Sequence, residues 1–218
     1  MSYLILKDLK INQELIDQLC AISWQDLTLA LRANSTEARQ FFFKNYKLTD
    51  YFDFVKYYGL NFNHAATLET YILPQPLEQK IIKEIQNYFH QEFDDLVIRI
   101  QVVYDGKVVP MHKDPTRTAS VVYPLDHHSY SSTVFYDSVG STDTVESSFL
   151  HLLNPTLFTE SSKVSIDQYP VLLDVKQAHQ VFLSDAYTKQ NPRLSLSIKW
   201  TKLEFDQLID MLNASDKF

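Results

Sequence analysis

A histidine and an aspartate with one residue between them, His112 and Asp114, are the most informative pair in the sequence. In an extended segment, positions i and i+2 project to the same side, so one imidazole and one carboxylate can reach the same metal ion. Two histidines and one carboxylate on one face of an octahedron leave three positions open, which is the arrangement of non-haem iron(II) oxygenases. The pair also occurs by chance in surface loops, so its surroundings decide its meaning.

The surroundings of this pair are rich in β-branched residues. The pair follows one such run, Leu96–Tyr104, and precedes another, Ser120–Leu125, which places it at the rim of a sheet. A third ligand has to come from elsewhere in the sheet, and His179 follows a further run, Val171–Val175. These positions favour a metal site over a surface loop.

Arg193 and Ser195 open the last β-rich run of the chain. Alternation along a strand places both side chains on one side. A guanidinium fork and a hydroxyl in that arrangement can hold a carboxylate through two or more hydrogen bonds. The sequence therefore offers an anion-binding pair close to the candidate metal ligands.

The elements that must position these residues fall into two groups. The first is mainly helical: a helix capped by Asn12, a second over Ser35–Lys44, and a third opened by Pro76. The second group consists of short strands, which predict an antiparallel sandwich or barrel: Leu96–Tyr104, Ser120–Leu125, Thr133–Tyr136, Val171–Val175 and Leu194–Trp200. A last amphipathic helix is expected over Leu203–Leu212. We expect one domain, with helical support at 1–94, a β core at 95–202 and a C-terminal helix at 203–218.

The composition is that of an ordinary globular protein. The chain has 218 residues, of which 45% are hydrophobic and 22% charged. The net charge of −7 argues against nucleic acid as a partner. The single cysteine, Cys20, excludes an internal disulfide framework. No segment approaches the about 20 apolar residues of a membrane span, and the first apolar run is too short for a signal peptide, so we expect a cytoplasmic protein. The oligomeric state is not predicted.

The β-rich half resembles a known family. The segment from Gln101 to Trp200 resembles the 2-oxoglutarate/Fe(II)-dependent dioxygenase superfamily, in its prolyl-hydroxylase-like branch. The resemblance covers just under half of the chain and lies in four stretches, QVVYDGKVVPMHKDPTRTASVVYPL, SSTVFYD, PVLLDVKQAHQVF and PRLSLSIKW. It implies an α+β fold with a double-stranded β-helix core of the jelly-roll or cupin-like kind, buttressed by the N-terminal helices.

The resemblance also implies the roles of individual residues. Iron(II) would be bound by His112, Asp114 and His179. Arg193, helped by Ser195, would pair with the far carboxylate of 2-oxoglutarate. The resemblance further implies a co-substrate pocket lined by Tyr104, a position facing the substrate or the near end of the co-substrate at Arg117, and packing alone for Trp200. The implied reaction consumes 2-oxoglutarate and O2, hydroxylates a C–H bond and releases succinate and CO2.

The chain departs from the family pattern in three places. Arg193 lies farther after His179 than usual, Ser131 and Ser132 replace glycines, and Pro124 stands where relatives often have a tyrosine. No ligand is lost, and the retained Asp114 argues against a halogenase. Two alternatives stay open: a cupin-like isomerase or hydrolase that uses the triad without 2-oxoglutarate, and a binding module without catalysis. The substrate, a small molecule or a peptide, is not identified.

The connector between Ser138 and Tyr169 is long for a compact domain. We expect it to cover the site as a lid, with a short helix at Ser148–Leu153. The remaining histidines are expected to be structural or loop residues: His64, His90, His127, His128 and His151.

Overall fold

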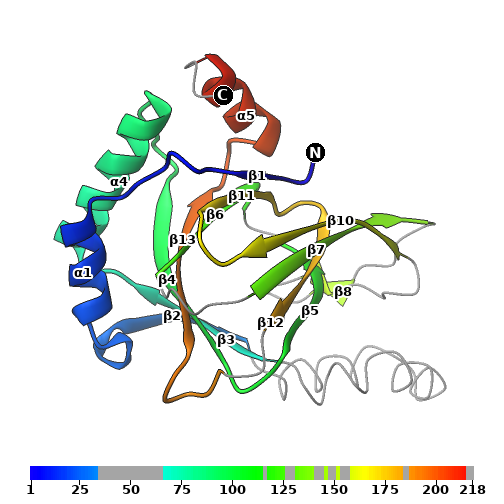
Figure 1. The fold of residues 1–218 in the computed structure, drawn as a ribbon, viewed down its shortest axis with the longest axis horizontal. Coiled ribbons are helices and arrows are strands. Elements are labelled where there is room, and N and C mark those ends of the chain that lie inside the picture. The colour runs from blue at the N-terminus through cyan, green and yellow to red at the C-terminus, as the bar shows by residue number, and fades with distance from the viewer. Residues whose placement is uncertain are drawn as a thin grey trace.

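A computed structural model describes eight parts of the chain (Figure 1): residues 1–33, 66–114, 117–125, 131–139, 145–146, 151–152, 158–183 and 187–214. The expected helix at Ser35–Lys44 lies outside the described residues, as do His64, His127 and His128. No described helix is long and apolar enough to cross a bilayer.

The described strands form two antiparallel sheets. The larger sheet has the order β1-β11-β6-β13-β4-β3-β2. Its strands are β1 (Tyr3–Ile5), β2 (Thr28–Ala33), β3 (Thr67–Ile72), β4 (Val97–Tyr104), β6 (Ala119–Pro124), β11 (Val171–Asp174) and β13 (Arg193–Trp200). The smaller sheet has the order β10-β7-β12-β5-β9-β8. Its strands are β5 (Val108–Lys113), β7 (Ser131–Ser138), β8 (Val145–Glu146), β9 (His151–Leu152), β10 (Phe158–Ile166) and β12 (Ala178–Leu183).

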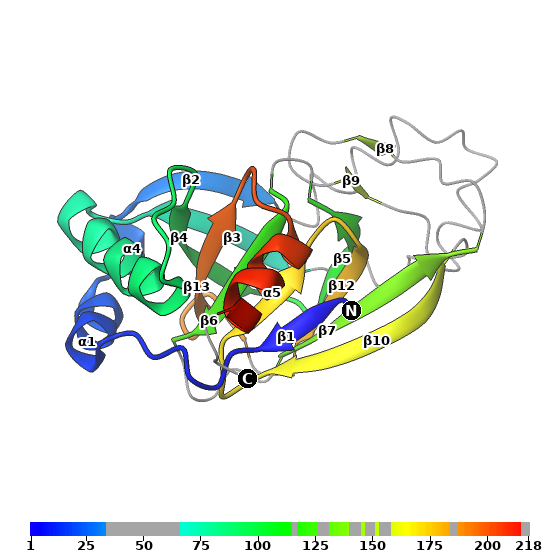
Figure 2. The same ribbon diagram turned by 90° about the horizontal axis from the view of Figure 1, so that it is seen from above.

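The chain alternates between the two sheets. From β4 to β7, and again from β10 to β13, each strand lies in the other sheet from the strand before it. Hydrophobic residues from both sheets pack together between them, among them Val122 of β6 and Phe135 of β7. The expected antiparallel sandwich is therefore confirmed, and Figures 1 and 2 show the smaller sheet beside the larger one.

Three helices pack against the outer face of the larger sheet: α1 (Gln13–Ala21), α4 (Gln75–Phe89) and α5 (Phe205–Ala214). Two begin as the sequence predicts. The Asn12 side chain accepts a hydrogen bond of 2.8 Å from the backbone N–H of Glu14 and so caps α1, and Pro76 lies in the first turn of α4. The helix expected at the C-terminus is α5.

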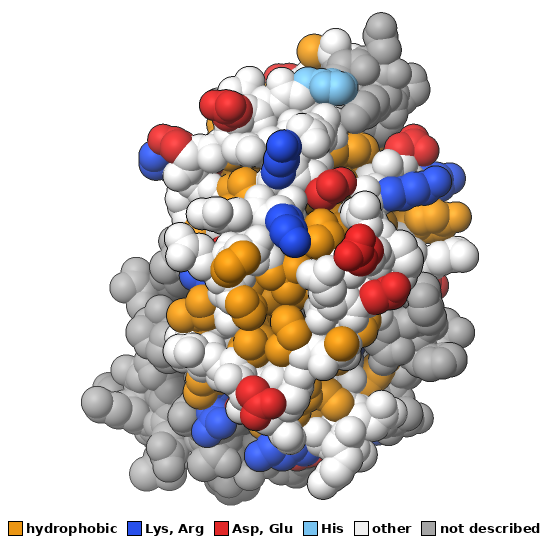
Figure 3. Space-filling model, turned by 90° about the vertical axis from the view of Figure 1, so that its left-hand side faces the viewer, with side chains coloured by type: hydrophobic (Ala, Val, Ile, Leu, Met, Phe, Trp, Pro, Cys, Tyr) orange, Lys and Arg blue, Asp and Glu red, His pale blue; other side chains and the backbone are white. Residues whose placement is uncertain are grey.

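The largest hydrophobic cluster lies between these helices and the larger sheet. Trp200, fully buried at the end of β13, meets the rings of Phe89 and Phe93 edge-on at centroid distances of 5.5 and 5.6 Å. Trp200 therefore has the packing role expected of it. Figure 3, which views the side carrying α1 and α4, shows hydrophobic side chains gathered at the centre of that face.

The helices α1 and α4 expected at 1–94 are accompanied there by three strands that were not expected, β1, β2 and β3. In β3 the buried residues run across both faces and include Glu69, which is 1% exposed. Its carboxylate pairs with Arg32 Nε at 2.6 Å and accepts a hydrogen bond from the Tyr71 hydroxyl at 2.5 Å. A buried charged residue interrupts the hydrophobic pattern of a strand. Hydrophobic periodicity therefore does not reveal β3.

The connector at 138–169 also differs from the expected lid. Residues Phe158–Ile166 form β10, which pairs with β7 along its whole length (Figure 2). At the position of the expected short helix, His151–Leu152 form β9 and pair with β5. The residues of β8, β9 and β10 within the expected lid are thus structural parts of the smaller sheet.

Candidate metal centre

Two neighbouring strands of the smaller sheet carry the histidines of the candidate site. His112 lies in β5, and Asp114 directly follows the end of that strand. His179, the second residue of β12, lies opposite His112 in the antiparallel pair. The backbone N–H of Asp114 donates to the carbonyl of Val175 at 3.0 Å, which fixes the chain where it leaves β5. The register of two strands therefore brings together residues that are far apart in the sequence.

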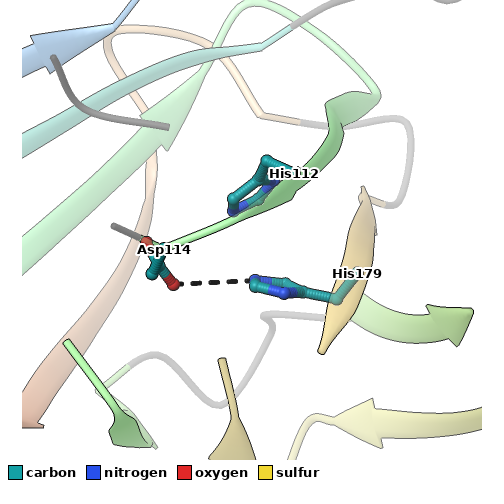
Figure 4. Close-up of side chains that lie close together, drawn as sticks. All are labelled: His112, Asp114 and His179. Carbon is teal, nitrogen blue, oxygen red and sulfur yellow. Dashed lines mark ion pairs between the residues drawn. The ribbon is translucent and has the colours of Figure 1, made fainter. Parts of the chain in front are cut away.

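The three side chains converge on one point (Figure 4). Each offers one ligand atom, and these atoms all lie within 4.8 Å of one another. The two imidazole rings have a centroid distance of 4.2 Å, and His179 Nε2 lies 3.8 Å from Asp114 Oδ2. The exposed fractions of His112, Asp114 and His179 are only 3%, 5% and 3%. The predicted residues are thus brought together in a place closed to bulk water.

A hydrogen bond orients the His179 ring. Its Nδ1 lies 2.9 Å from the backbone carbonyl of Gln177. Because a carbonyl only accepts, Nδ1 carries the proton and Nε2 keeps its lone pair toward Asp114. Metal-binding histidines usually donate their second ring N–H to such an acceptor. This partner cannot be named from the sequence alone, because it is a backbone carbonyl.

Arg117 lies against Asp114. Its Nη2 is 2.7 Å from Asp114 Oδ2, and its Nη1 reaches the hydroxyls of Ser197 at 3.1 Å and Ser120 at 3.4 Å. Burial by itself raises the pKa of Asp114, but the guanidinium of Arg117 and the two imidazoles outweigh it and hold that pKa below its ordinary value. The carboxylate is therefore ionised and ready to act as a ligand.

The His179 imidazole is neutral near pH 7. Burial lowers its pKa, and the neighbouring His112 lowers it further, to about 3. A neutral imidazole is the form that binds metals. The donor set of two imidazoles and one carboxylate is that of a facial triad. Two donors bound to one ion at about 2.1 Å lie at most about 4.2 Å apart, so a small side-chain adjustment lets these three share an ion.

The lowered pKa of His179 predicts how the stability of the metal-free protein depends on pH. Below pH 6.5 His179 is protonated in the unfolded chain, whereas in the folded chain it stays neutral down to about pH 3. The free energy of unfolding is therefore unaffected by His179 above pH 6.5. It decreases as the pH falls below that value, by about 2 kcal/mol at pH 5. Denaturant unfolding of the metal-free protein between pH 8 and pH 5 measures this loss.

Two variants test the origin of that loss. His179→Asn is expected to make the free energy of unfolding less dependent on pH, because the imidazole with the lowered pKa is absent. His90→Asn, which changes an exposed histidine at the end of α4, is expected to keep it. An unchanged slope in His179→Asn would show that His179 is protonated normally in the folded protein.

A cavity between the sheets joins the metal ligands to Arg193. Its wall contains His112, His179, Arg117 and Arg193, together with Gln101 and Thr133. Arg193 is 2% exposed at the start of β13. Hydrophobic residues of both sheets complete the wall: Leu68, Val103, Val109, Val122, Ile166, Leu173, Val175 and Val181. The cavity is small, about 40 Å³, and its wall is mainly apolar with a few polar groups.

Two hydroxyl side chains lie near Arg193 in this part of the fold. Ser195 is fully buried, and its hydroxyl donates to Gln101 Oε1 at 3.2 Å. Thr133 in β7 is also fully buried and lines the cavity, and its Oγ1 has no hydrogen-bond partner within the described part of the chain. A buried hydroxyl without a partner is costly, so a polar ligand that completes its hydrogen bonds fits this cavity.

The structure contradicts the expected role of Tyr104. The side chains of Gln101 and Val103 face the cavity from β4, and strand alternation turns Tyr104 to the opposite, helix-covered face. There its ring lies 6.3 Å from that of Trp24. Tyr104 therefore does not line the co-substrate pocket.

Comparisons with known proteins add little. No family model and no curated protein matches the sequence. Among solved structures, the epimerase SnoN in complex with Fe3+, alpha ketoglutarate and nogalamycin RO has 10% identity, covers 87% of this chain and 84% of its own, and gives a TM-score of 0.42.

Two further solved structures each give a TM-score of 0.33. Hydroquinone 1,2-dioxygenase PnpCD, in complex with Cd2+ and 4-hydroxybenzonitrile, has 11% identity over 47% of this chain and 57% of its own. Vicilin from Corylus avellana (hazelnut) has 9% identity over 64% of this chain and 29% of its own. Likenesses of this strength say nothing about activity, so the function has to be inferred from the site.

Proposed function

We propose that this protein is an Fe(II)- and 2-oxoglutarate-dependent dioxygenase that hydroxylates a C–H bond of a small molecule or peptide. The observation that carries the proposal is the buried convergence of His112, Asp114 and His179, because both histidines line a cavity whose wall also contains Arg193. The three donors fit iron(II), and a buried guanidinium in the same cavity fits a dicarboxylate co-substrate.

The order of the strands supports this proposal. Eight strands, β4 to β7 and β10 to β13, alternate between the sheets in the order β11-β6-β13-β4 and β10-β7-β12-β5. This is the strand order of a double-stranded β-helix, or jelly roll. Both histidines lie on the strands of the smaller sheet, and Arg193 begins a strand of the larger one. We place the chain in the prolyl-hydroxylase-like branch on the sequence motifs alone.

Residues in and around the cavity have defined parts in this function. Arg193 would hold the far carboxylate of 2-oxoglutarate with two parallel hydrogen bonds, and the Thr133 hydroxyl would donate a further one. Gln177 would keep the His179 ring oriented through its carbonyl, and Arg117 would keep the Asp114 carboxylate ionised. The apolar wall would exclude water from the reacting groups.

Bound iron(II) would supply the oxidative chemistry, in which O2 and 2-oxoglutarate are consumed and succinate and CO2 are released. The chain itself contributes binding and orientation. His112 and His179 are both buried, and His179 is also held neutral, so protons do not compete for its donor atom. The two histidines are therefore already in place to bind a metal ion before it enters the site.

Release of succinate from 2-oxoglutarate tests the proposal. The purified protein is incubated with iron(II), ascorbate, O2 and a panel of amino acids, peptides and small metabolites. We expect succinate to form only when iron(II), 2-oxoglutarate and O2 are all present, and to form faster with a substrate. No succinate under any condition, from a protein that binds both iron(II) and 2-oxoglutarate, would favour a binding module without catalysis.

A further inference from the structure

One face of β13 is polar along its whole length. Strand alternation places Arg193, Ser195, Ser197 and Lys199 on the side turned toward the smaller sheet. Residues on the other side, such as Leu196 and Ile198, pack under the helices. A buried strand face that carries two cations and two hydroxyls is expensive to fold, so ligand binding is the natural reason for it.

Lys199 lies at the metal end of this face, six residues from Arg193. It is directly opposite Ser120 of β6, and the Ser120 hydroxyl is 3.4 Å from Arg117 Nη1. The next residue on the same face of its strand, Ser197, also contacts Arg117, at 3.1 Å. Lys199 and Arg117 are therefore neighbours beside Asp114.

No carboxylate of the described residues forms an ion pair with Lys199. Burial lowers its pKa to about 7, the repulsion from Arg117 adds to this, and Asp114 opposes it only in part. The nearby Arg99 is already paired with Glu78 at 2.9 Å. With a pKa of about 7, Lys199 is only partly protonated near neutral pH, and an anion beside Lys199 and Arg117 would favour its charged form.

The proposed metal and co-substrate do not supply that anion. The two charges of iron(II) are balanced by Asp114 and by the near carboxylate of 2-oxoglutarate, and the far carboxylate is balanced by Arg193. Arg117 and Lys199 remain. Two buried cations side by side repel each other, and an anion between them removes both the repulsion and the desolvation cost.

We propose that the molecule oxidised at this site carries an anionic group, and that Lys199 together with Arg117 binds it beside the metal. The inference rests on the proposed function and adds to it the class of substrate. Lys199 determines specificity, because it distinguishes an acid from the corresponding neutral compound. A carboxylate and a phosphate group satisfy the same two cations.

Binding of matched acids and amides tests this inference without turnover. Protein holding Zn(II), which does no redox chemistry, and 2-oxoglutarate is titrated with hexanoate, benzoate, N-acetyl-leucine and phenyl phosphate. Hexanamide, benzamide, N-acetyl-leucinamide and phenol serve as neutral counterparts, and ligand-observed NMR gives each Kd. We expect at least one acid to bind at least about tenfold more tightly than its neutral counterpart.

Substitutions at Lys199 locate the preference. Lys199→Met is expected to raise the Kd of that acid about tenfold and to leave the neutral compound unchanged, while Lys199→Arg keeps the preference. Lys202→Met, at an exposed lysine whose side chain is 67% accessible, is the matched control and should behave as the parent protein. If circular dichroism shows that Lys199→Met is unfolded, Lys199→Gln takes its place.

Three results would overturn the inference: no acid of the panel binds, acids and neutral compounds bind alike, or Lys199→Met leaves the acid Kd unchanged. A Lys199→Met protein that instead loses 2-oxoglutarate would assign Lys199 to the co-substrate and also overturn it. Failure of the parent protein to bind Zn(II) or 2-oxoglutarate at all would contradict the proposed function itself.

Discussion

Asp114→Asn is expected to weaken iron(II) binding by more than the about 10- to 100-fold that is usual for residues that only orient metal ligands. The carboxylate is the single anionic donor beside two imidazoles, so its loss removes most of the attraction for a divalent cation. Anaerobic titration with iron(II), or with Mn(II) followed by its paramagnetic signal, measures the loss. The amide keeps the size of the side chain and an acceptor for Arg117, whose Nη2 lies 2.7 Å from Asp114 Oδ2.

Asp114→Ala is the less informative variant, because it leaves the guanidinium of Arg117 largely buried without its anion. Breaking a buried pair in this way costs about 3–5 kcal/mol, so loss of metal binding could reflect unfolding. Asp94→Ala is the matched control, since Asp94 is 83% accessible and pairs only with exposed Lys202. An Asp114→Asn protein with undiminished metal affinity would show that Asp114 is only an ion-pair partner of Arg117.

The sequence predicts those features of the site that depend on neighbouring residues. The relation of His112 to Asp114 is set by the alternation of an extended segment, and the same alternation places Arg193 and Ser195 on one side. The same alternation continues to Lys199, because Arg193–Trp200 has a polar residue at every second position.

The sequence does not predict the features that depend on strand register or on phase. That His179 lies opposite His112 is a matter of how β5 and β12 pair, and no local pattern fixes such a pairing. The family resemblance assigned Tyr104 to the wrong face. The sequence alone could not correct this, because Val102, Val103 and Tyr104 are all buried and hydrophobicity does not show which face each of them occupies. The strand β3 was missed for a related reason, since its buried Glu69 forms an ion pair with Arg32, which is distant in the sequence.

Arg193→Ala is expected to raise the Kd of 2-oxoglutarate about 100-fold in the presence of Zn(II) and to leave metal affinity unchanged. A guanidinium that is 2% exposed binds a carboxylate through charge-assisted hydrogen bonds that water does not weaken. Arg193→Lys keeps the charge but not the planar fork, so its affinity should lie between the two. Isothermal titration calorimetry of the three proteins measures the difference.

A ligand without the far carboxylate supplies the control for this variant. 2-Oxobutanoate keeps the keto acid that would face the metal but has nothing for Arg193 to hold, so its Kd should be the same in Arg193→Ala and the parent protein. Equal losses for both ligands would mean that the substitution damages the cavity as a whole. Full affinity for 2-oxoglutarate in Arg193→Ala would remove this residue from co-substrate binding and favour a metal enzyme that uses the triad without 2-oxoglutarate. The two ligands together therefore separate a specific anion contact from a general effect on the fold.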